Sequence, residues 1–423
     1  MKKHRYQAKA LQDVNWPDIA FEVANQRLVF AVDVAKEKFV AALMIDREEP
    51  LSTIMWDHPA ETRTLGVLLG DLPADHIEVV MEPSGTYGDS VREHLRSLGC
   101  EIFLASPKRV HDAAEVYDGV PSLHDAKAAY IIGRLHLDGA SQPWPENSAH
   151  RRDQKALIAE LDLYQSDHRR NFNRLEAQLS RHWPELEQVA DVDSAGVLRL
   201  LADYGDPRSV CRNRDEAEKL IHHTRRGVAA SERVSAILDS AEASLGVPCT
   251  EGERHLLQTL AEELRRTRAA TRAVQRSIDI RVDQDVELSR IGKAFGNATS
   301  LVLEAALGSP LDYPNAGSYV KAMGLNLKER SSGTHKGELH ITKRGPGRAR
   351  HYLFLAAMRA VQRDPVIRAW YRKKLTRDGK VTRYNAQVAV MRKLGMAIWH
   401  VARGSPFDSS KLFNVANLDL ANT

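Results

Sequence analysis

Two adjacent serines stand in a basic loop bracketed by glycines. Ser331 and Ser332 lie between Arg330 and Gly333, and Lys336 precedes the next glycine. A serine hydroxyl can attack phosphorus when a base, a metal ion or cationic surroundings activate it, and nearby arginines and lysines stabilise the transition-state charge. The pattern is typical either of a serine nucleophile for phosphodiester chemistry or of a phosphate-binding loop without a covalent role. The side chains expected to bind nucleic acid are Arg330, Lys336, Lys343, Arg344, Arg348 and Arg350.

Carboxylates form the second candidate group, far upstream of the serines. Asp33 and Glu82 each end an apolar run, and two further acids follow. Mg²⁺ prefers such oxygen ligands and leaves room for a substrate phosphate, and two such ions can stabilise the attacking and leaving oxygens of phosphoryl transfer. The predicted metal ligands are Asp33, Glu82, Asp125 and Asp118. The alternative is a turn or cap role, since Ser122 and Asp125 have the spacing of a capping box.

The acids can meet only if the apolar runs pair in one sheet. Alternating and apolar patterns predict strands at 28–33, 39–45, 51–56, 77–82 and 101–105, and helices at 61–72, 86–98 and 126–137. Three strands, a helix and then alternating strands and helices is the order of an RNase H-like fold. In that fold, acids at strand ends converge on one edge of the sheet.

The rest of the chain is expected to be mostly helical. Apolar residues step by threes and fours from 148 to 182 and from 252 to 283, which favours two long helices paired as an antiparallel coiled coil. The second helix carries the seam Leu257, Leu260, Leu264, Thr267, Thr271, Val274 and Ile278. Further on, Gly292 and Gly296 resemble the turn of a helix-hairpin-helix, whose backbone N–H groups would bind DNA phosphates.

The predicted fold class is therefore α/β plus α. The predicted parts are a leader (1–27), an RNase H-like domain (28–147), a coiled coil (148–288) with a helical insert (185–250), a mostly helical serine-bearing domain (289–413) and a tail (414–423).

Positive charge is concentrated towards the C-terminus. The chain of 423 residues has a formal net charge of +4, but residues 321–404 carry 20 Lys and Arg against 4 Asp and Glu, so this stretch is +16 and the remainder −12. Such segregation favours a polyanionic partner over a merely solvated helix face. No apolar run is long enough to cross a bilayer, and three cysteines without a CxxC pair predict neither a disulfide framework nor a zinc site. A cytoplasmic setting without a membrane partner is expected.

Several motifs resemble the DEDD transposases of the insertion-sequence 110 family, which are related to the Piv DNA invertase. They are FAVDVAK (30–36), MEPSGTY (81–87), HDAK (124–127), and GLNLKERSSG (324–333) followed by ITKRG (341–345). The resemblance covers about residues 28–413. It implies an N-terminal RuvC-like domain, a coiled coil and a C-terminal transposase domain that supplies a serine.

The resemblance also implies an activity and partners. Members of the family recombine the ends of an insertion element with target DNA, guided by a bridge noncoding RNA, and assemble as dimers and tetramers with composite sites. The expected partners are therefore double-stranded DNA, a bridge RNA and further copies of the chain. Mg²⁺ is the expected cofactor, and the bacterial cytoplasm, at the nucleoid during action, is the expected location.

The family's functional residues match this chain at most positions. Asp33, Glu82 and Asp125 correspond to three of its acids, and Ser122 stands where the family has a further Asp. Asp118 or His124 can compensate for this missing acid, or the metal site has fewer ligands than is usual in the family. For the nucleophile, Ser332 is favoured because it directly precedes Gly333, with Ser331 as the alternative.

Three hypotheses remain at this point. The first is a serine-using, Mg²⁺-dependent DNA recombinase, and the second is a RuvC-like junction nuclease that uses metal-bound water and never links to DNA. The third is a nucleic-acid-binding protein with a degenerate acid site. No helix-turn-helix or zinc-finger pattern is present, so the chain is not expected to read DNA sequence by itself.

Overall fold

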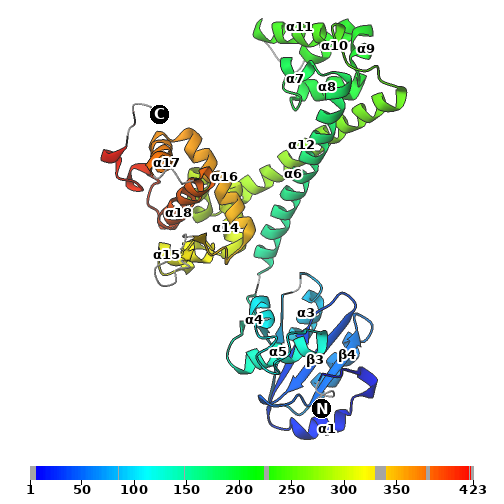
Figure 1. Cartoon of the computed structure of the whole chain (residues 1–423), viewed down its shortest axis with the longest axis vertical. Coiled ribbons are helices and arrows are strands. Elements are labelled where there is room, and N and C mark those ends of the chain that lie inside the picture. The colour runs from blue at the N-terminus through cyan, green and yellow to red at the C-terminus, as the bar shows by residue number, and fades with distance from the viewer. Residues whose placement is uncertain are drawn as a thin grey trace. The chain divides into compact units, whose positions relative to one another are not determined.

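The computed structural model describes residues 6–83, 85–146, 148–222, 228–328, 340–377, 382–418 and 420. The chain forms two compact units, Met1–Glu146 and Asn147–Thr423 (Figure 1). Within the described residues, no helix is both long and apolar enough to cross a membrane.

A seven-stranded mixed sheet is the centre of the N-terminal unit, in the order β1-β4-β3-β2-β5-β6-β7. β2, β5 and β6 are parallel, and β3 is antiparallel to both of its neighbours. The elements are β1 (Lys9–Ala10), η1 (Leu11–Asp13), α1 (Trp16–Glu22), β2 (Arg27–Asp33), β3 (Lys38–Met44), β4 (Ser52–Asp57), α2 (Thr62–Gly70), β5 (His76–Met81), α3 (Asp89–Ser97), β6 (Glu101–Leu104), α4 (Pro107–Asp112), α5 (Asp125–Leu137) and β7 (Gln142–Pro143). Each predicted strand is confirmed, with bounds shifted by at most one residue. This mixed α/β architecture is consistent with an RNase H-like domain.

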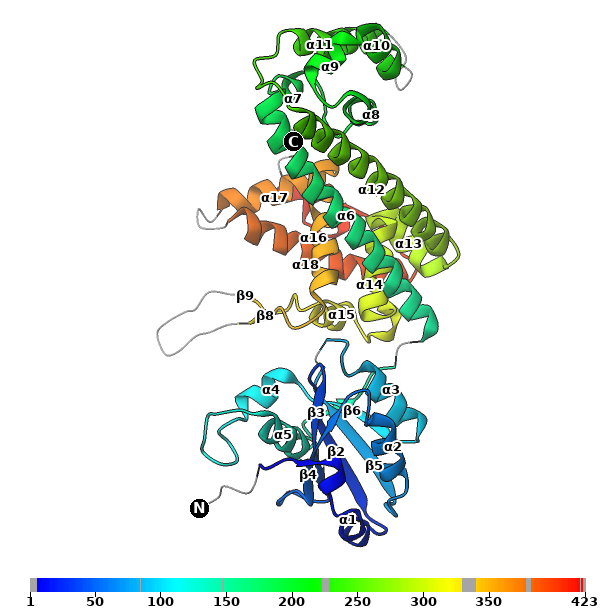
Figure 2. The same ribbon diagram turned by 90° about the vertical axis from the view of Figure 1, so that its right-hand side faces the viewer.

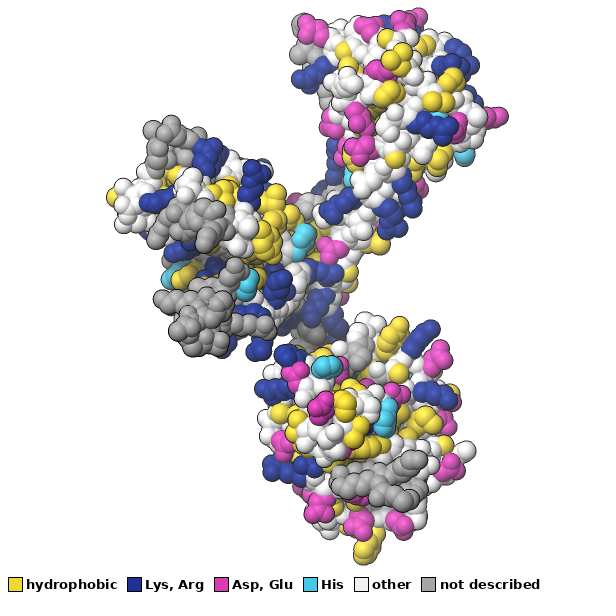
Figure 3. Space-filling view, viewed as in Figure 1, with side chains coloured by type: hydrophobic (Ala, Val, Ile, Leu, Met, Phe, Trp, Pro, Cys, Tyr) yellow, Lys and Arg dark blue, Asp and Glu magenta, His cyan; other side chains and the backbone are white. Residues whose placement is uncertain are grey.

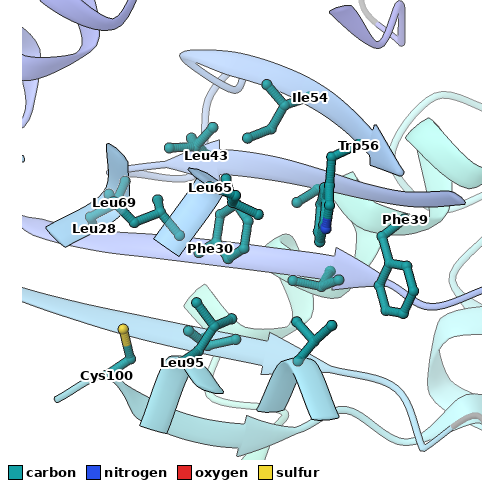
Figure 4. Packing of buried hydrophobic residues seen from close by; sticks show 14 of the residues in the cluster. Leu28, Phe30, Phe39, Leu43, Ile54, Trp56, Leu65, Leu69, Leu95 and Cys100 are labelled. Atoms are coloured by element: carbon teal, nitrogen blue, oxygen red, sulfur yellow. The ribbon is translucent and has the colours of Figure 1, made fainter. Parts of the chain in front are cut away.

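Helices cover both faces of this sheet (Figure 2). Side chains alternate along β2, so Leu28 and Phe30 enter the core beneath α2 and α3, while Val29 and Ala31 pack against α5. Figure 4 shows the first of these cores, in which the rings of Phe30 and Trp56 lie 6.0 Å apart. A strand buried on both faces has a continuous apolar sequence, and its tight packing fixes the position of the residue at its end.

Residues 9–23, which the sequence predicted to be part of a leader, fold with the sheet. β1 pairs with β4, and Leu11, Ile19 and Val23 are buried in the same core as Phe30. The predicted leader is therefore corrected for the described residues from Tyr6 onward. Pro17 lies in the first turn of α1, where its missing N–H costs nothing.

Two long antiparallel helices run through the second unit. α6 (Ala149–His182) and α12 (Glu251–Asp283) pack against each other. His150 near the start of α6 contacts Arg281 near the end of α12, and Arg181 pairs with Glu253 at the opposite ends. Of the predicted α12 seam, every residue is buried except Thr271, which is half-buried.

Shorter helices complete this unit on either side of α12. Those between α6 and α12 are α7 (Leu186–Val189), α8 (Ala195–Tyr204), α9 (Pro207–Arg212), α10 (Arg214–His222) and α11 (Val228–Glu242). Those after α12 are α13 (Val286–Phe295), α14 (Asn297–Leu307), η2 (Pro310–Asp312), α15 (Ala316–Ala322), α16 (Gly347–Arg363), α17 (Pro365–Arg377), α18 (Arg383–Ala402), η3 (Ser409–Lys411) and η4 (Val415–Asn417), together with the strands β8 (Leu327–Lys328) and β9 (His340–Ile341). Gly296 makes the turn between α13 and α14 at φ +96°, whereas Gly292 lies inside α13.

Candidate active site

Asp33 and Glu82 lie at the same edge of the sheet. β2 and β5 are parallel neighbours, and Val32 is paired with Met81. Asp33 is the last residue of β2, and Glu82 directly follows β5. The two carboxylates therefore occupy equivalent positions on adjacent strands, which lie about 4.8 Å apart in any sheet.

Burial and neighbouring charge disfavour the ionised form of Asp33. Burial, followed by the negative charges of Asp125 and Glu82, raises the pKa of Asp33 to about 6, against a smaller lowering by the backbone hydrogen bond of Val34. Burial also raises the pKa of Glu82. The charges that disfavour ionised Asp33 are therefore those of Asp125 and Glu82, and we call these three acids the acidic cluster.

The donor chemistry of this cluster fits Mg²⁺. Among the described residues, no three His, Cys, Asp or Glu side chains approach closely enough to hold an ion by themselves. Mg²⁺ does not need such a cage, because it commonly takes one or two carboxylates and completes its shell with water and substrate phosphates. Asp33, Glu82 and Asp125 are the residues that would hold it, and a cation would offset their mutual repulsion.

Asp125 does not belong to a capping box. α5 begins at Asp125 itself, its N-cap is His124, and no side chain caps the helix. Ser122 is exposed and lies before the helix begins, so its spacing to Asp125 has no capping role and that alternative is wrong. The exposed Asp125 is the first residue of α5.

Asp118 has protein partners at both of its carboxylate oxygens. Lys127 Nζ donates to Asp118 Oδ1 at 2.8 Å, and the Tyr6 hydroxyl donates to Oδ2 at 3.0 Å. Lys127 is only 2% exposed and also donates to the carbonyl of Val120 at 2.6 Å. Asp118 is not among the charges that act on Asp33, and we do not include it among the proposed metal ligands.

Lys127 is the residue of this site that residue-by-residue sequence reasoning missed. It lies two positions after Asp125 on α5, and its contacts with Asp118 and Val120 connect that helix to the preceding loop. This ion pair therefore positions the segment that leads to Asp125. A lysine inside the otherwise apolar stretch 126–133 was the available signal, because a lysine is rarely buried without a partner.

The serine loop lies outside the described residues, but its base is part of the structure. Ser331, Ser332, Arg330 and Lys336 belong to residues 329–339, which the structure does not describe. β8 and β9 on either side of them pair antiparallel. Beside this pair, Thr342 N donates to the Asn326 carbonyl at 2.9 Å. The two ends of the serine-bearing segment are therefore held together as the base of a hairpin.

A close backbone contact supports this hairpin base. Gly324 has φ +73°, and a Cβ placed there would lie 2.7 Å from the backbone N of Arg344. Lys343, itself at φ +55°, donates its N–H to the Gly324 carbonyl at 2.9 Å. Only glycine permits both the left-handed backbone and this approach, so GLNLK and ITKRG are sequence motifs partly because their backbones touch.

The predicted nucleic-acid-binding cations that the structure describes fall into two groups. Lys343 and Arg344 are exposed beside the hairpin base. Arg350 instead donates to the carbonyls of Met323 and Gly345, at 3.1 and 2.7 Å. Arg348 pairs with Asp162 of α6 at 2.8 Å and is 45% exposed. Arg350 thus supports the hairpin base, while Lys343 and Arg344 remain available to a ligand.

The mixed α/β fold with acids at its strand ends is consistent with the RNase H-like class of domains, and comparison with known proteins identifies the family. Residues 30–184 match a family of DEDD transposases of the IS110 type, and residues 290–372 match the IS116/IS110/IS902 transposase family. A Streptomyces coelicolor protein described as an "Insertion element IS110 uncharacterized 43.6 kDa protein" is 23% identical over 347 residues, which cover 79% of this chain and 84% of that protein. The two family matches together span more than half of the sequence. The chain belongs to the IS110 family of insertion-element transposases, a membership that implies a DNA substrate and DNA cleavage and joining.

Proposed function

We propose that this transposase cuts and rejoins donor and target DNA through a serine–DNA intermediate, with Mg²⁺ held by Asp33, Glu82 and Asp125. The observation that carries the metal site is the register of β2 and β5, which puts Asp33 beside Glu82 at one sheet edge. The raised pKa of Asp33 supports it. The hairpin base formed by β8 and β9, together with the family membership, supports the role of the serine loop.

The chemistry assigns a role to each group. The Ser332 hydroxyl, or that of Ser331, attacks a DNA phosphorus, the serine proton passes to a base, and the bond from phosphorus to the leaving sugar oxygen breaks. That oxygen takes up a proton, and the phosphoserine linkage keeps the bond energy until a DNA hydroxyl attacks it in reverse. Bound Mg²⁺ would stabilise negative charge on the phosphate oxygens. Arg330, Lys336, Lys343 and Arg344 would bind the phosphate.

We further propose a bridge noncoding RNA as guide and a dimer or tetramer as the active assembly. Both follow from the family resemblance of the motifs. The chain carries no helix-turn-helix or zinc-finger pattern with which its own side chains would read a DNA sequence. Base pairing between a guide RNA and the DNA would select the site instead.

Cleavage by acid-site variants tests the metal role. The full chain, with any copurifying RNA, is incubated with element-end DNA in Mg²⁺ or in EDTA. We expect cleavage only in Mg²⁺, and a loss of more than about 100-fold in Asp33→Asn, since even supporting residues of metal sites contribute 10–100-fold. Asp13→Asn, an exposed acid of the same unit, is the matched control. Cleavage by Asp33→Asn at the wild-type rate would refute the metal site.

A further inference from the structure

The middle of the α6–α12 pair presents a concentration of arginines that lies outside the C-terminal basic stretch. Residues 265–276 of α12 contain five arginines and no acid, and residues 168–174 of α6 contain three arginines and no acid. The antiparallel packing brings these two segments to the same level, where His168 Nδ1 lies 3.2 Å from Thr267 Oγ1. Lys and Arg side chains gather along this helix pair (Figure 3).

A groove of about 410 Å³ opens between the two helices at this level. Arg169 and Phe172 of α6 line one side, and Arg268 and Arg272 of α12 line the other. Phe172 is half-buried and packs into the core of the unit. The groove therefore combines a mainly apolar lining with three guanidinium groups and one carboxylate, that of Asp193, which pairs with Arg268.

Buried polar contacts fix the shape of this groove. His168 joins Thr267, which is fully buried, to Asp193 before α8, with His168 Nε2 3.2 Å from Asp193 Oδ2. Arg268 donates to the backbone carbonyl of Asp193. Three separate segments of the chain are thereby held together, so the arginines project from a rigid support.

Only some of these arginines are neutralised within the chain. Ion pairs within the chain engage four of them: Arg170 with Asp167, Arg265 with Glu262, Arg266 with Glu263, and Arg268 with Asp193. Arg169, Arg272 and Arg276 are exposed, and among the residues that the structure describes no carboxylate pairs with them. Their positive charges are therefore available to an external anion.

We propose that this arginine groove, lined by Arg169 and Arg272 and extended by Arg276 on the next turn of α12, binds the phosphate backbone of double-stranded DNA. Arginines four residues apart on α12 are separated by about 6 Å along the helix axis, and a DNA strand carries a phosphate about every 3.4 Å of its axis. Such a row meets several phosphates at once. It would hold the duplex without reading its sequence.

Other occupants fit the groove less well. A second copy of this chain would bring the same arginines against these ones, and like charges oppose that contact. Single-stranded nucleic acid is bound through aromatic rings on which bases stack, whereas Phe172 is packed into the protein core. Duplex DNA is the substrate that the family implies, and its backbone matches a fixed row of cations.

The test compares two triple variants of the full chain. One replaces Arg169, Arg272 and Arg276 with Gln. The other, called the tip variant, removes the same charge by replacing with Gln three exposed arginines of the shorter helices α9 and α11, namely Arg208, Arg212 and Arg233. Binding to a duplex DNA of arbitrary sequence is measured by fluorescence anisotropy in EDTA between 50 and 200 mM NaCl, so that failure of the proposed cleavage chemistry does not affect the readout.

We expect the groove variant to bind DNA at least about 10-fold more weakly. The slope of log K against log salt concentration should fall by about 2–3, because each phosphate contact contributes about 0.9. The tip variant should keep the wild-type slope, and replacement of the three groove arginines with Lys should keep most of it. The proposal would be overturned if both Gln variants lost the same DNA affinity, or if the groove variant bound DNA as the wild type does. It would also be overturned if the groove variant lost affinity only for duplex RNA, or changed its sedimentation mass without a change in DNA affinity.

Discussion

At the scale of single residues, Asp33 shows a conflict between stability and the proposed function. Its carboxylate is half-buried beside Glu82 and Asp125, and its pKa is raised to about 6 from 3.8. The folded state therefore holds a proton more tightly than the unfolded state does. The contribution to stability is present below about pH 4 and is lost as the pH rises through about 6.

Because the pKa of Asp33 is raised in the folded state, removing its charge should stabilise the chain at high pH. In EDTA at pH 8, Asp33→Asn should unfold at a higher temperature than the wild type, with a gain on the order of 1–2 kcal/mol after allowance for solvent screening. The gain should vanish below about pH 3, where Asp33 is protonated in both the folded and the unfolded state. Thermal denaturation followed by circular dichroism measures it. A less stable Asp33→Asn protein at pH 8 would show that the three acids do not repel one another.

The second prediction concerns the buried ion pair between Lys127 and Asp118. Replacing Lys127 with Met leaves the Asp118 carboxylate without its cation, and replacing Asp118 with Asn leaves a buried ammonium group. Each change should cost about 3 kcal/mol, as broken buried ion pairs do. The double variant should cost much less than the two single changes added together. Urea denaturation of all four proteins measures this coupling, and additive losses would rule it out.

These residues also show what sequence reasoning can and cannot find. Asp33 and Glu82 were predictable because each ends an apolar strand, and parallel strands bring their ends to one edge. The partnership of Lys127 with Asp118 was not predictable, since it depends on how a loop of irregular backbone folds back onto α5. For the same reason the sequence suggested Asp118 as a metal ligand, although Lys127 and Tyr6 contact its oxygens.

At the scale of elements, the hairpin base depends on a glycine. Gly324→Ala should destabilise the chain by about 1–3 kcal/mol, because alanine would have to adopt φ +73° against the backbone of Arg344. DNA cleavage should fall with it, since β8 and β9 border the serine loop. Gly252→Ala is the control: Gly252 lies in the first turn of α12 with nothing within 4 Å of the added Cβ. That variant should be neutral or gain up to about 1 kcal/mol, and similar stability of the two variants would contradict the close contact.

Glu304 of α14 should make the stability of the chain depend on pH. Burial, followed by the charges of Glu287 and Asp285, raises the pKa of Glu304 to about 7 from 4.5, and Arg151 only partly offsets this. Stability should therefore fall as the pH rises from about 4.5 to above 7. Glu304→Gln should remove this loss and gain on the order of 1–3 kcal/mol at pH 8, with no gain near pH 4. The control Glu187→Gln, at an exposed position, should leave the stability unchanged at both pH values in thermal denaturation. A stability difference between Glu304→Gln and the wild type that is the same at pH 4 and pH 8 would contradict the prediction.

The elements themselves were largely predictable where one face or stripe is apolar. The strands and both long helices follow from periodicity, because burial selects the side chains at each second, third or fourth position. The described part of the predicted leader, from Tyr6 onward, was wrongly predicted because a short strand and a short helix give little periodic signal. Their order comes from contacts with β4 and with the core around Phe30, which are distant in sequence.

At the scale of the whole molecule, charge segregation hides a second basic surface. The excess of Lys and Arg over Asp and Glu in residues 321–404 is visible when charge is averaged over a long stretch of sequence. The arginines of α12 are followed by Asp279 and preceded by Glu262 and Glu263, so averaging conceals them. Their importance emerges only when α6 and α12 pair and place arginines from both helices on one groove. A basic surface built from two distant segments cannot be found from one segment alone.

The chain as a whole carries the acidic cluster in one compact unit and the serine-bearing segment in the other. Each is insufficient alone: carboxylates with a metal ion can support simple hydrolysis, and a serine in a basic loop can merely bind phosphate. The serine–DNA linkage is what separates a recombinase from a junction nuclease, and it is therefore the central claim.

Trapping that linkage is the most direct test. The full chain, with any copurifying RNA, is incubated with element-end DNA and Mg²⁺, denatured, and examined for DNA covalently bound to protein. We predict an adduct in the wild type and in Ser331→Ala, and none in Ser332→Ala or Asp33→Asn. Cleaved DNA without an adduct in any of these proteins would contradict the serine mechanism and identify the chain as a hydrolytic nuclease with a phosphate-binding loop.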